Sequence, residues 1–151
     1  MTDARIGYGT IYEIWDASLT VPAFVEVAEV INVTPGEATA DRIDATHMQS
    51  PNRRREYISG LIDNGEASFE INWVPGSDTD VLLRELFESG DTVQHRITFP
   101  AATGARPTVT YEASIIGFSK AIPIDDRMTA TITVAVSGDE TWDVEGAGGG
   151  V

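Results

Sequence analysis

Cysteine is absent from this sequence of 151 residues, and basic residues are scarce. Without cysteine the chain has no disulfide, no thiolate metal ligand and no cysteine nucleophile, which fits a reducing compartment. Ten lysines and arginines stand against 24 aspartates and glutamates, so the net charge is −14. A chain this acidic is unsuited to neutralising DNA phosphates or to docking on anionic lipid.

Long apolar runs and catalytic spacings are also missing. No stretch approaches the roughly 18 apolar residues of a membrane span, and the N-terminus lacks a signal-peptide pattern, so we expect neither a membrane anchor nor secretion. His47 and His95 do not have metal-ligand spacing, and no G-x-S-x-G motif occurs, although a Ser–His–Asp triad could still form from distant residues. We expect a non-enzymatic protein without metal or cofactor, with His95 in a core or sheet and His47 exposed.

Short segments of alternating polarity dominate what is present, separated by clusters of Gly, Pro, Asn and Asp. This pattern predicts a mainly β, antiparallel sandwich or barrel in a single domain, 1–151. The strands are expected at 10–15, 24–33, 37–44, 55–62, 66–74, 92–99, 108–118 and 129–137.

The pair Asn64-Gly65 predicts a tight hairpin that joins the strands 57–62 and 66–74, because both residues tolerate positive φ. The second of these strands alternates strictly, which predicts one core face and one polar face. The polar face faces solvent unless another surface covers it. The core face holds Ala67, Phe69, Ile71 and Trp73, and the polar face holds Glu66, Ser68, Glu70 and Asn72.

One flanking helix is expected at about 78–88. Ser77 suits its N-cap, and Gly90 suits a left-handed stop. Apolar residues recur there at spacings of three and four, which predicts a stripe packed against the sheet. The stripe consists of Leu82, Leu83, Leu86 and Phe87.

The polar segment 45–55 is longer than an ordinary hairpin loop. It is either a disordered excursion or a functional loop. It ends in Arg53-Arg54-Arg55, which is either a solvated loop or a complement to an acidic patch on another copy. A contact of the second kind is head-to-tail and generates rings or filaments.

An ordered set of motifs across roughly 25–136 resembles the major tail tube proteins of long non-contractile-tailed phages of the lambda type, a family that also occurs in gene transfer agents. The motifs are Val33-Thr34-Pro35-Gly36-Glu37, 68–76 (SFEINWVPG), Leu82-Leu83 with Phe87, Gly90-Asp91-Thr92, Ile97-Thr98-Phe99-Pro100 and Ile116-Gly117-Phe118-Ser119-Lys120-Ala121.

The resemblance implies a virion tail protein, assembled in the host cytoplasm, whose copies form hexameric rings stacked around a channel. DNA would pass through that channel without specific binding, and a tape measure protein, a tail terminator and tail tip proteins would be partners. The long loop would contact another subunit or ring through His47, Met48, Arg53, Arg54 and Arg55. Glu66 and Glu70 are expected to face the channel or a neighbouring subunit, since carboxylates do not bind DNA.

The resemblance also implies termini that become ordered on assembly. These are a flexible N-terminal segment, 1–9, and a flexible acidic and Gly-rich C-terminal tail, 138–151. Two alternatives remain at this point: a tail terminator or connector ring with the same fold, and a small ligand-binding β-barrel whose polar loop closes over a cavity.

Overall fold

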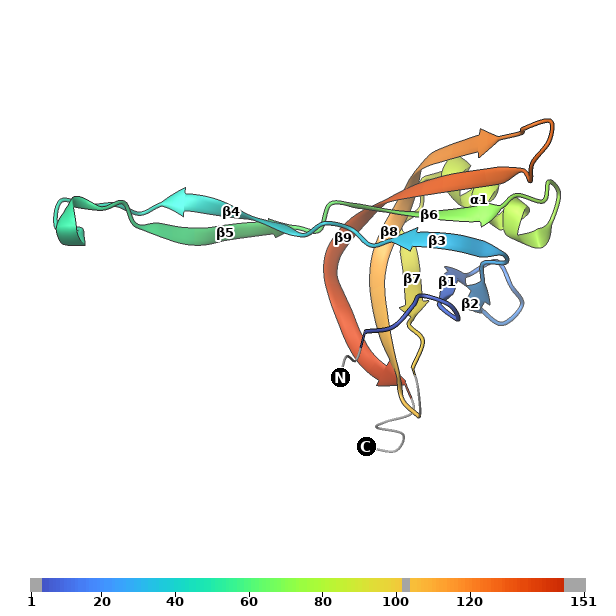
Figure 1. Ribbon diagram of the computed structural model, residues 1–151, viewed down its shortest axis with the longest axis horizontal. Coiled ribbons are helices and arrows are strands. Elements are labelled where there is room, and N and C mark those ends of the chain that lie inside the picture. The colour runs from blue at the N-terminus through green and yellow to red at the C-terminus, as the bar shows by residue number, and fades with distance from the viewer. Residues whose placement is uncertain (1–3, 102–103, 146–151) are drawn as a thin grey trace.

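A curved β-sheet forms the body of the molecule, and a two-stranded arm projects from it (Figure 1). The computed structural model describes residues 4–101 and 104–145. The body sheet has seven antiparallel strands in the order β2-β1-β7-β8-β9-β6-β3. Their bounds are β1 Ile11–Asp16, β2 Ala23–Glu26, β3 Val30–Thr34, β6 Glu66–Asn72, β7 Val93–Thr98, β8 Arg106–Ala121 and β9 Thr129–Glu145.

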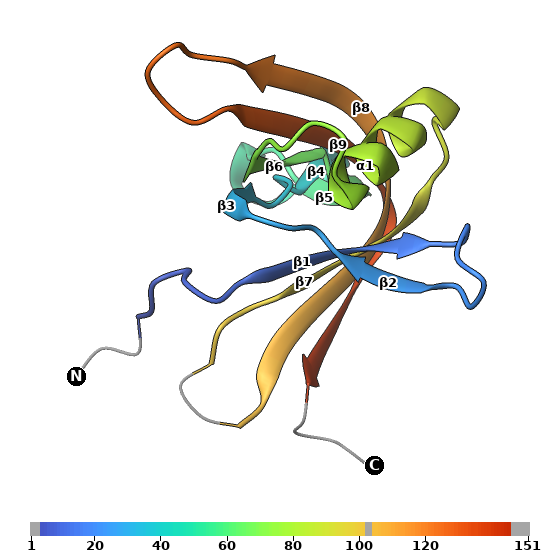
Figure 2. The same cartoon turned by 90° about the vertical axis from the view of Figure 1, so that its right-hand side faces the viewer.

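The predicted mainly β, antiparallel fold with one helix is therefore confirmed. The sheet bends so that β1 approaches β6, and the rings of Tyr12 and Phe69 lie 4.2 Å apart between centroids. It does not close into a barrel, because β2 and β3 are its two edge strands. Figure 2 shows the curvature along β8 and β9, whose register shifts at two places, between Thr110 and Glu112 and between Ile115 and Gly117. Such irregularities bend a strand and increase its twist.

The core lies inside this bend and follows the predicted alternation. On β6 the buried residues are Ala67, Phe69 and Ile71, whereas Glu66 on the opposite face is exposed. On β9 the residues Ala130, Ile132 and Val134 are buried, so the alternation continues across the sheet. Alternate side chains of a strand point to opposite faces, which leaves one apolar face and one polar face on the body sheet.

Helix α1 (Asp78–Ser89) packs against β8. Its ends are as predicted: the Ser77 side chain accepts a hydrogen bond from the Asp80 amide, and Gly90 is left-handed with φ +70°. The predicted stripe is correct only in part. Leu83 is buried and Leu86 packs on the core, but Phe87 is 42% exposed.

Asp80 is the buried anchor of this helix, which the sequence did not reveal. It accepts hydrogen bonds from Trp73 Nε1 at 2.8 Å and from the Gly76 amide at 2.9 Å, and Arg84 pairs with it one turn later. Burial opposes its ionisation, but these hydrogen bonds and the Arg84 charge outweigh that effect and lower the pKa of Asp80. The first turn is thereby tied to the end of β6.

Two local predictions are wrong, one for a strand and one for a hairpin. The expected strand 24–33 is divided into β2 and β3, since Glu29 is left-handed with φ +57° and turns the chain. Asn64-Gly65 does not join a hairpin. The strand before it, β5 (Tyr57–Asp63), pairs only with β4 (Thr39–Asp44), whereas β6 after it pairs with β3 and β9. Gly65 does have positive φ, at +69°, but it marks the point where the chain passes from arm to body.

The predicted C-terminal tail 138–151 is also corrected, because residues 138–145 belong to β9. The backbone pairing of β8 with β9 extends to Arg106 opposite Glu145. Trp142 stacks on Phe99 with ring centroids 5.9 Å apart. The acidic residues 139, 140 and 143 interrupt the apolar alternation, so the sequence pattern did not predict this part of the strand. Residues 146–151, like residues 1–3 of the predicted N-terminal segment, lie outside the described part of the chain.

Candidate assembly surfaces

The hairpin arm, residues 39–63, consists of β4 (Thr39–Asp44), β5 (Tyr57–Asp63) and the tip that connects them, 45–56. The two strands pair with each other and with no other described strand. Figure 1 shows them extending well away from the body sheet. A two-stranded hairpin without further packing is only marginally stable in water. The arm therefore presents both of its faces for contact with another molecule.

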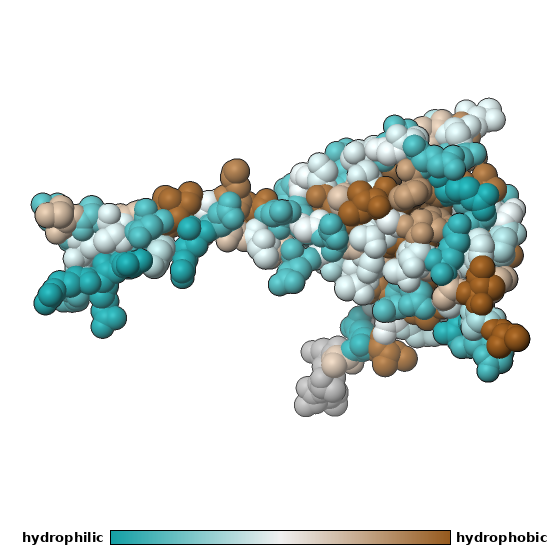
Figure 3. Space-filling model, turned by 90° about the horizontal axis from the view of Figure 1, so that it is seen from above, coloured by the Kyte–Doolittle hydropathy of each residue, from teal (hydrophilic) through white to brown (hydrophobic). Residues whose placement is uncertain are grey.

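One face of the arm is apolar. Ile43 lies opposite Ile58 in the register, and residues directly opposite each other share a face. Gly60 leaves room for Ile43, whose Cδ1 would be 3.0 Å from a Cβ added at that glycine. Ile43 and Ile58 are 48% and 56% exposed, and the space-filling view shows apolar side chains along the arm (Figure 3). No described part of the body covers this face.

The other face of the arm is mixed. The Arg42 guanidinium lies 4.2 Å from the centre of the Tyr57 ring, and Asp44 is paired with Tyr57 in the register. Hydrogen bonds from the Thr46 side chain and amide lower the pKa of Asp44, and the charges of Arg55 and Arg42 act in the same direction. This carboxylate thereby helps to hold the start of the tip.

The tip is an ordered turn. The Ser50 hydroxyl donates to Glu56 Oε2 at 2.6 Å and accepts from the His47 amide at 3.0 Å, and His47 Nε2 lies 3.3 Å from the same carboxylate oxygen. A short 3-10 helix, Pro51–Arg53, carries left-handed Asn52 and Arg53. The interpretation of this segment as a disordered excursion is therefore wrong.

The predicted inter-subunit residues gather at this tip. Met48 is 100% exposed, and Arg53, Arg54 and Arg55 are all exposed as well. None of the ion pairs among the described residues includes these three arginines. His47 is also exposed, as expected, although it is tied to Glu56. The tip thus presents basic and apolar side chains at the far end of the molecule.

The arm joins the body at a tight backbone crossing. A Cβ added at Gly36 would lie 2.5 Å from the Asn64 carbonyl oxygen, and one at Gly65 would lie 2.8 Å from the Glu37 carbonyl oxygen. The Gly65 carbonyl accepts from the Val136 amide at 3.1 Å, and the Asn64 side chain donates to the Gly138 carbonyl. Two glycines therefore permit two chain segments to leave the sheet side by side.

A groove of about 800 Å³, the base groove, lies beside this crossing. Leu61 and Ile62 are exposed within it, at 84% and 70%, and carboxylates stand around them. The groove is lined by Asp41, Leu61, Ile62, Asp63, Asn64, Val136, Ser137, Gly138 and Asp139.

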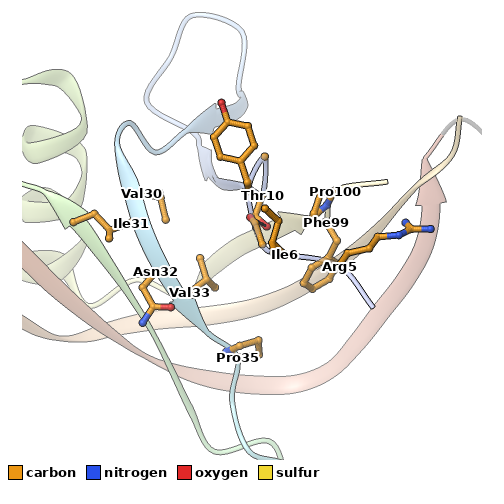
Figure 4. A pocket seen from close by; sticks show the side chains of 13 residues that line it. Arg5, Ile6, Thr10, Val30, Ile31, Asn32, Val33, Pro35, Phe99 and Pro100 are labelled. Atoms are coloured by element: carbon orange, nitrogen blue, oxygen red, sulfur yellow. Dashed lines mark hydrogen bonds between the residues drawn. The ribbon is translucent and has the colours of Figure 1, made fainter. Parts of the chain in front are cut away.

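A second groove, of about 790 Å³, separates β3 from the N-terminal segment (Figure 4). Its walls are mostly apolar, with Val30 and Val33 of β3 on one side and Ile6, Phe99 and Pro100 on the other. The groove is open to solvent and far from the tip, so the polar loop does not close over a cavity. The ligand-binding β-barrel alternative loses its basis.

Glu66 and Glu70 are separate from the tip residues. They lie on the polar face of β6, opposite Ala135 and Thr131 of β9. The same face carries an ion pair from Glu13 of β1 to Arg96 of β7, at 2.7 Å between Oε2 and Nη2. Glu66 is exposed and Glu70 is half-buried. Both carboxylates are therefore available to a channel or to a neighbour.

Tyr12, His95 and Tyr111 form a polar cluster in the interior. The Tyr12 hydroxyl contacts His95 Nδ1 at 2.7 Å and the Tyr111 hydroxyl at 2.8 Å. Burial lowers the pKa of His95 to about 4 and raises the pKa of Tyr111 to about 12. His95 Nε2 is buried and makes no hydrogen bond with the described residues. His95 is thus a core histidine, as predicted.

No group of three or more His, Asp or Glu side chains in the described ranges could hold a metal ion. Across 4–101 and 104–145, no helix has both the length and the apolar character to span a bilayer.

Comparison with known proteins gives a consistent result. The family model described as "Lambda phage tail tube protein, TTP" matches residues 8–143. No curated protein matches the chain in sequence. A chain in the tail of an empty GTA particle with C6 symmetry is similar at a TM-score of 0.72 and 18% identity, over 93% of this chain and 99% of that one.

Two further structures share the fold. The SPP1 tail tube is similar at a TM-score of 0.67 and 10% identity, over 90% of this chain and 77% of that one. The sheath/tube terminator of the PVC extracellular contractile injection system is similar at 0.69 and 12% identity, over 93% and 96%. At these identities the similarity shows a common fold alone.

Proposed function

This chain belongs to the lambda phage tail tube protein family, and we propose that it is the repeating subunit of a tail tube. It is a structural component of a phage or gene transfer agent particle. Six copies form a ring, and rings stack around a channel through which DNA passes. The C6 symmetry of the GTA tail, whose subunit has the same fold, supports the number six.

The hairpin arm is the observation that carries this proposal. It places Ile43 and Ile58, which are both exposed and share one face, on a two-stranded ribbon outside the body, where its own chain does not cover them. Apolar side chains grouped this way mark a protein interface. A second copy supplies the cover, so that each subunit extends its arm onto the next one. Contacts between two different surfaces of identical copies continue from subunit to subunit.

The tip forms the contact between rings through His47, Met48, Arg53, Arg54 and Arg55. Its arginines form no ion pair among the described residues, and the molecule has a net charge of −14. A basic tip on an acidic molecule finds complementary charge on any other copy. Replacing the three arginines with glutamate leaves the monomer folded by circular dichroism and blocks tube formation. Normal tubes from that variant would remove the tip from the interface.

The polar face of the body sheet lines the channel, with Glu66 and Glu70 directed into it or toward a neighbouring subunit. Their place on the polar face of β6 supports this assignment. Each lysine or arginine on the wall would attract DNA phosphates by releasing counterions, whereas carboxylates leave the wall non-adhesive. A tube structure with both carboxylates on the outer wall would overturn the assignment.

The role is structural, and we assign the chain no catalytic residue and no cofactor. The proposed partners are further copies of the chain, a tape measure protein, a tail terminator and tail tip proteins. A terminator function is the second candidate, because the PVC sheath/tube terminator has the same fold. The copy number per particle separates the two: a tube protein is present in many rings, and a terminator in one.

Electron microscopy of the purified protein tests the proposal. Hollow tubes or hexameric rings are the expected result after negative staining. A strict monomer at all concentrations that binds a small metabolite would contradict it and support a binding protein instead.

A further inference from the structure

We propose that the base groove of one copy receives the arm tip of the next copy. The inference rests on the proposed assembly and names the surface that accepts the tip. The groove is lined by the exposed apolar side chains of Leu61 and Ile62 and by the carboxylates of Asp41, Asp63 and Asp139. The tip offers the complementary set, a fully exposed Met48 and the arginines 53–55.

Two other cavities of the described residues do not fit the tip. The groove beside β3 has Arg5 in its wall and no carboxylate, so it repels an arginine run. The pocket beside the start of α1 measures about 160 Å³, which is too small for a turn with three arginines. The base groove, at about 800 Å³, is large enough, and it is open.

The tip and the groove cannot meet within one chain. They lie at opposite ends of the arm, and β4 alone spans about 20 Å at 3.3 Å per residue. The register of β4 with β5 holds the ribbon extended between them. The contact is therefore made between copies, and each copy keeps one free tip and one free groove. Assembly of this kind continues until it closes or runs out of subunits.

Charge reversal in the groove tests this contact. The variant Asp41→Lys/Asp139→Lys should raise the protein concentration needed for tube formation at least about tenfold. The control Asp125→Lys/Asp126→Lys changes the net charge equally on exposed residues of the turn between β8 and β9, and it should assemble as wild type does. Asp126 is a matched control for Asp139, because each carboxylate accepts a hydrogen bond from the backbone amide of the next residue.

A second test exchanges the charges of the base groove and the tip, so that the groove becomes basic and the tip acidic. Combining the groove variant with Arg53→Glu, Arg54→Glu and Arg55→Glu should restore the assembly that each set alone impairs. A groove variant that forms tubes at the wild-type concentration would overturn the inference, and so would a combined variant that stays as defective as its parents. If wild-type protein forms no tubes at all, the proposed function fails instead.

Cross-linking gives an independent readout, because the natural chain contains no cysteine. Met48→Cys with Ser137→Cys should yield a disulfide-linked ladder longer than a dimer after tubes are oxidised. The control pair Met48→Cys with Ser18→Cys places the second thiol in the exposed turn between β1 and β2, and it should give no ladder. Tubes that give equal ladders for both pairs, or none for the first, would contradict the contact.

Discussion

The Tyr12 hydroxyl lies 2.7 Å from Nδ1 of His95, in the centre of the core. The imidazole is fully buried, and protonation would place a charge there beside the rings of Tyr12 and Tyr111. Its pKa falls from 6.5 to about 4 because of this burial. The folded state therefore takes up the proton less readily than the unfolded chain does.

We predict that this histidine makes the subunit acid-sensitive. Its contribution is fully present above pH 6.5 and declines as the pH falls toward 4, by about 3 kcal/mol in total. Urea unfolding between pH 7 and pH 4 measures it. A His95→Gln variant should lose this part of the pH dependence, while the many carboxylates contribute equally to both proteins. Identical pH profiles would contradict the prediction.

Tyr12 is the centre of the polar cluster, since its hydroxyl contacts both His95 and Tyr111. Tyr12→Phe leaves two buried polar groups without a partner, and it should lower the free energy of unfolding by about 1–3 kcal/mol. Tyr111→Phe removes a peripheral member and should cost less. Urea midpoints for the two variants in one buffer decide the order, and a larger loss for Tyr111→Phe would count against it.

Asp80 should be the residue of α1 that is most sensitive to loss of charge. Asp80→Asn turns an amide toward the donors Trp73 and Gly76, and it should destabilise the fold by about 1–3 kcal/mol. Asp78→Asn, in the same first turn but exposed, should cost a few tenths of a kcal/mol. Because the pKa of Asp80 is lowered, its contribution is present above the ordinary aspartate pKa of 3.8 and is lost as the pH falls further. Equal thermal midpoints for the two variants would show that the anchor is unimportant.

The crossing at Gly36 should control the direction of the arm. A Cβ in Gly36→Ala meets a carbonyl oxygen at 2.5 Å, and backbone must move to relieve that contact. We predict a folded body with impaired tube formation, measured by circular dichroism and sedimentation. Gly7→Ala is the control, because its added Cβ has nothing nearer than 3.9 Å. A Gly36→Ala protein that assembles normally would show that the crossing tolerates movement.

Period-two alternation predicted the body strands well, because residues such as Phe69 and Ile71 pack against one another inside the bend. Local chemistry also predicted the ends of α1, since the Ser77 cap and the left-handed Gly90 depend on neighbouring residues. The pairing of the strands could not be predicted from the local sequence. Asn64-Gly65 has the composition of a hairpin turn, but β5 pairs with β4, and only the whole topology decides that.

Of the candidate surfaces, the sequence predicted one and not the other. The tip was predictable because three consecutive arginines on an acidic chain are conspicuous in the sequence. The base groove was not, since it combines Asp41 with Asp139, which are far apart along the chain. Ile43 and Ile58 gave a possible signal for the apolar face of the arm, but alternation alone indicates a buried face as readily as an interface.

Electron cryomicroscopy of the polymer formed by the purified protein tests the central claim most directly. The account predicts hollow tubes of stacked six-membered rings, with each hairpin arm on a neighbouring copy and with Glu66 and Glu70 on the channel side. Protein that remains monomeric under all conditions, or tubes in which the arms extend freely into solvent, would contradict it.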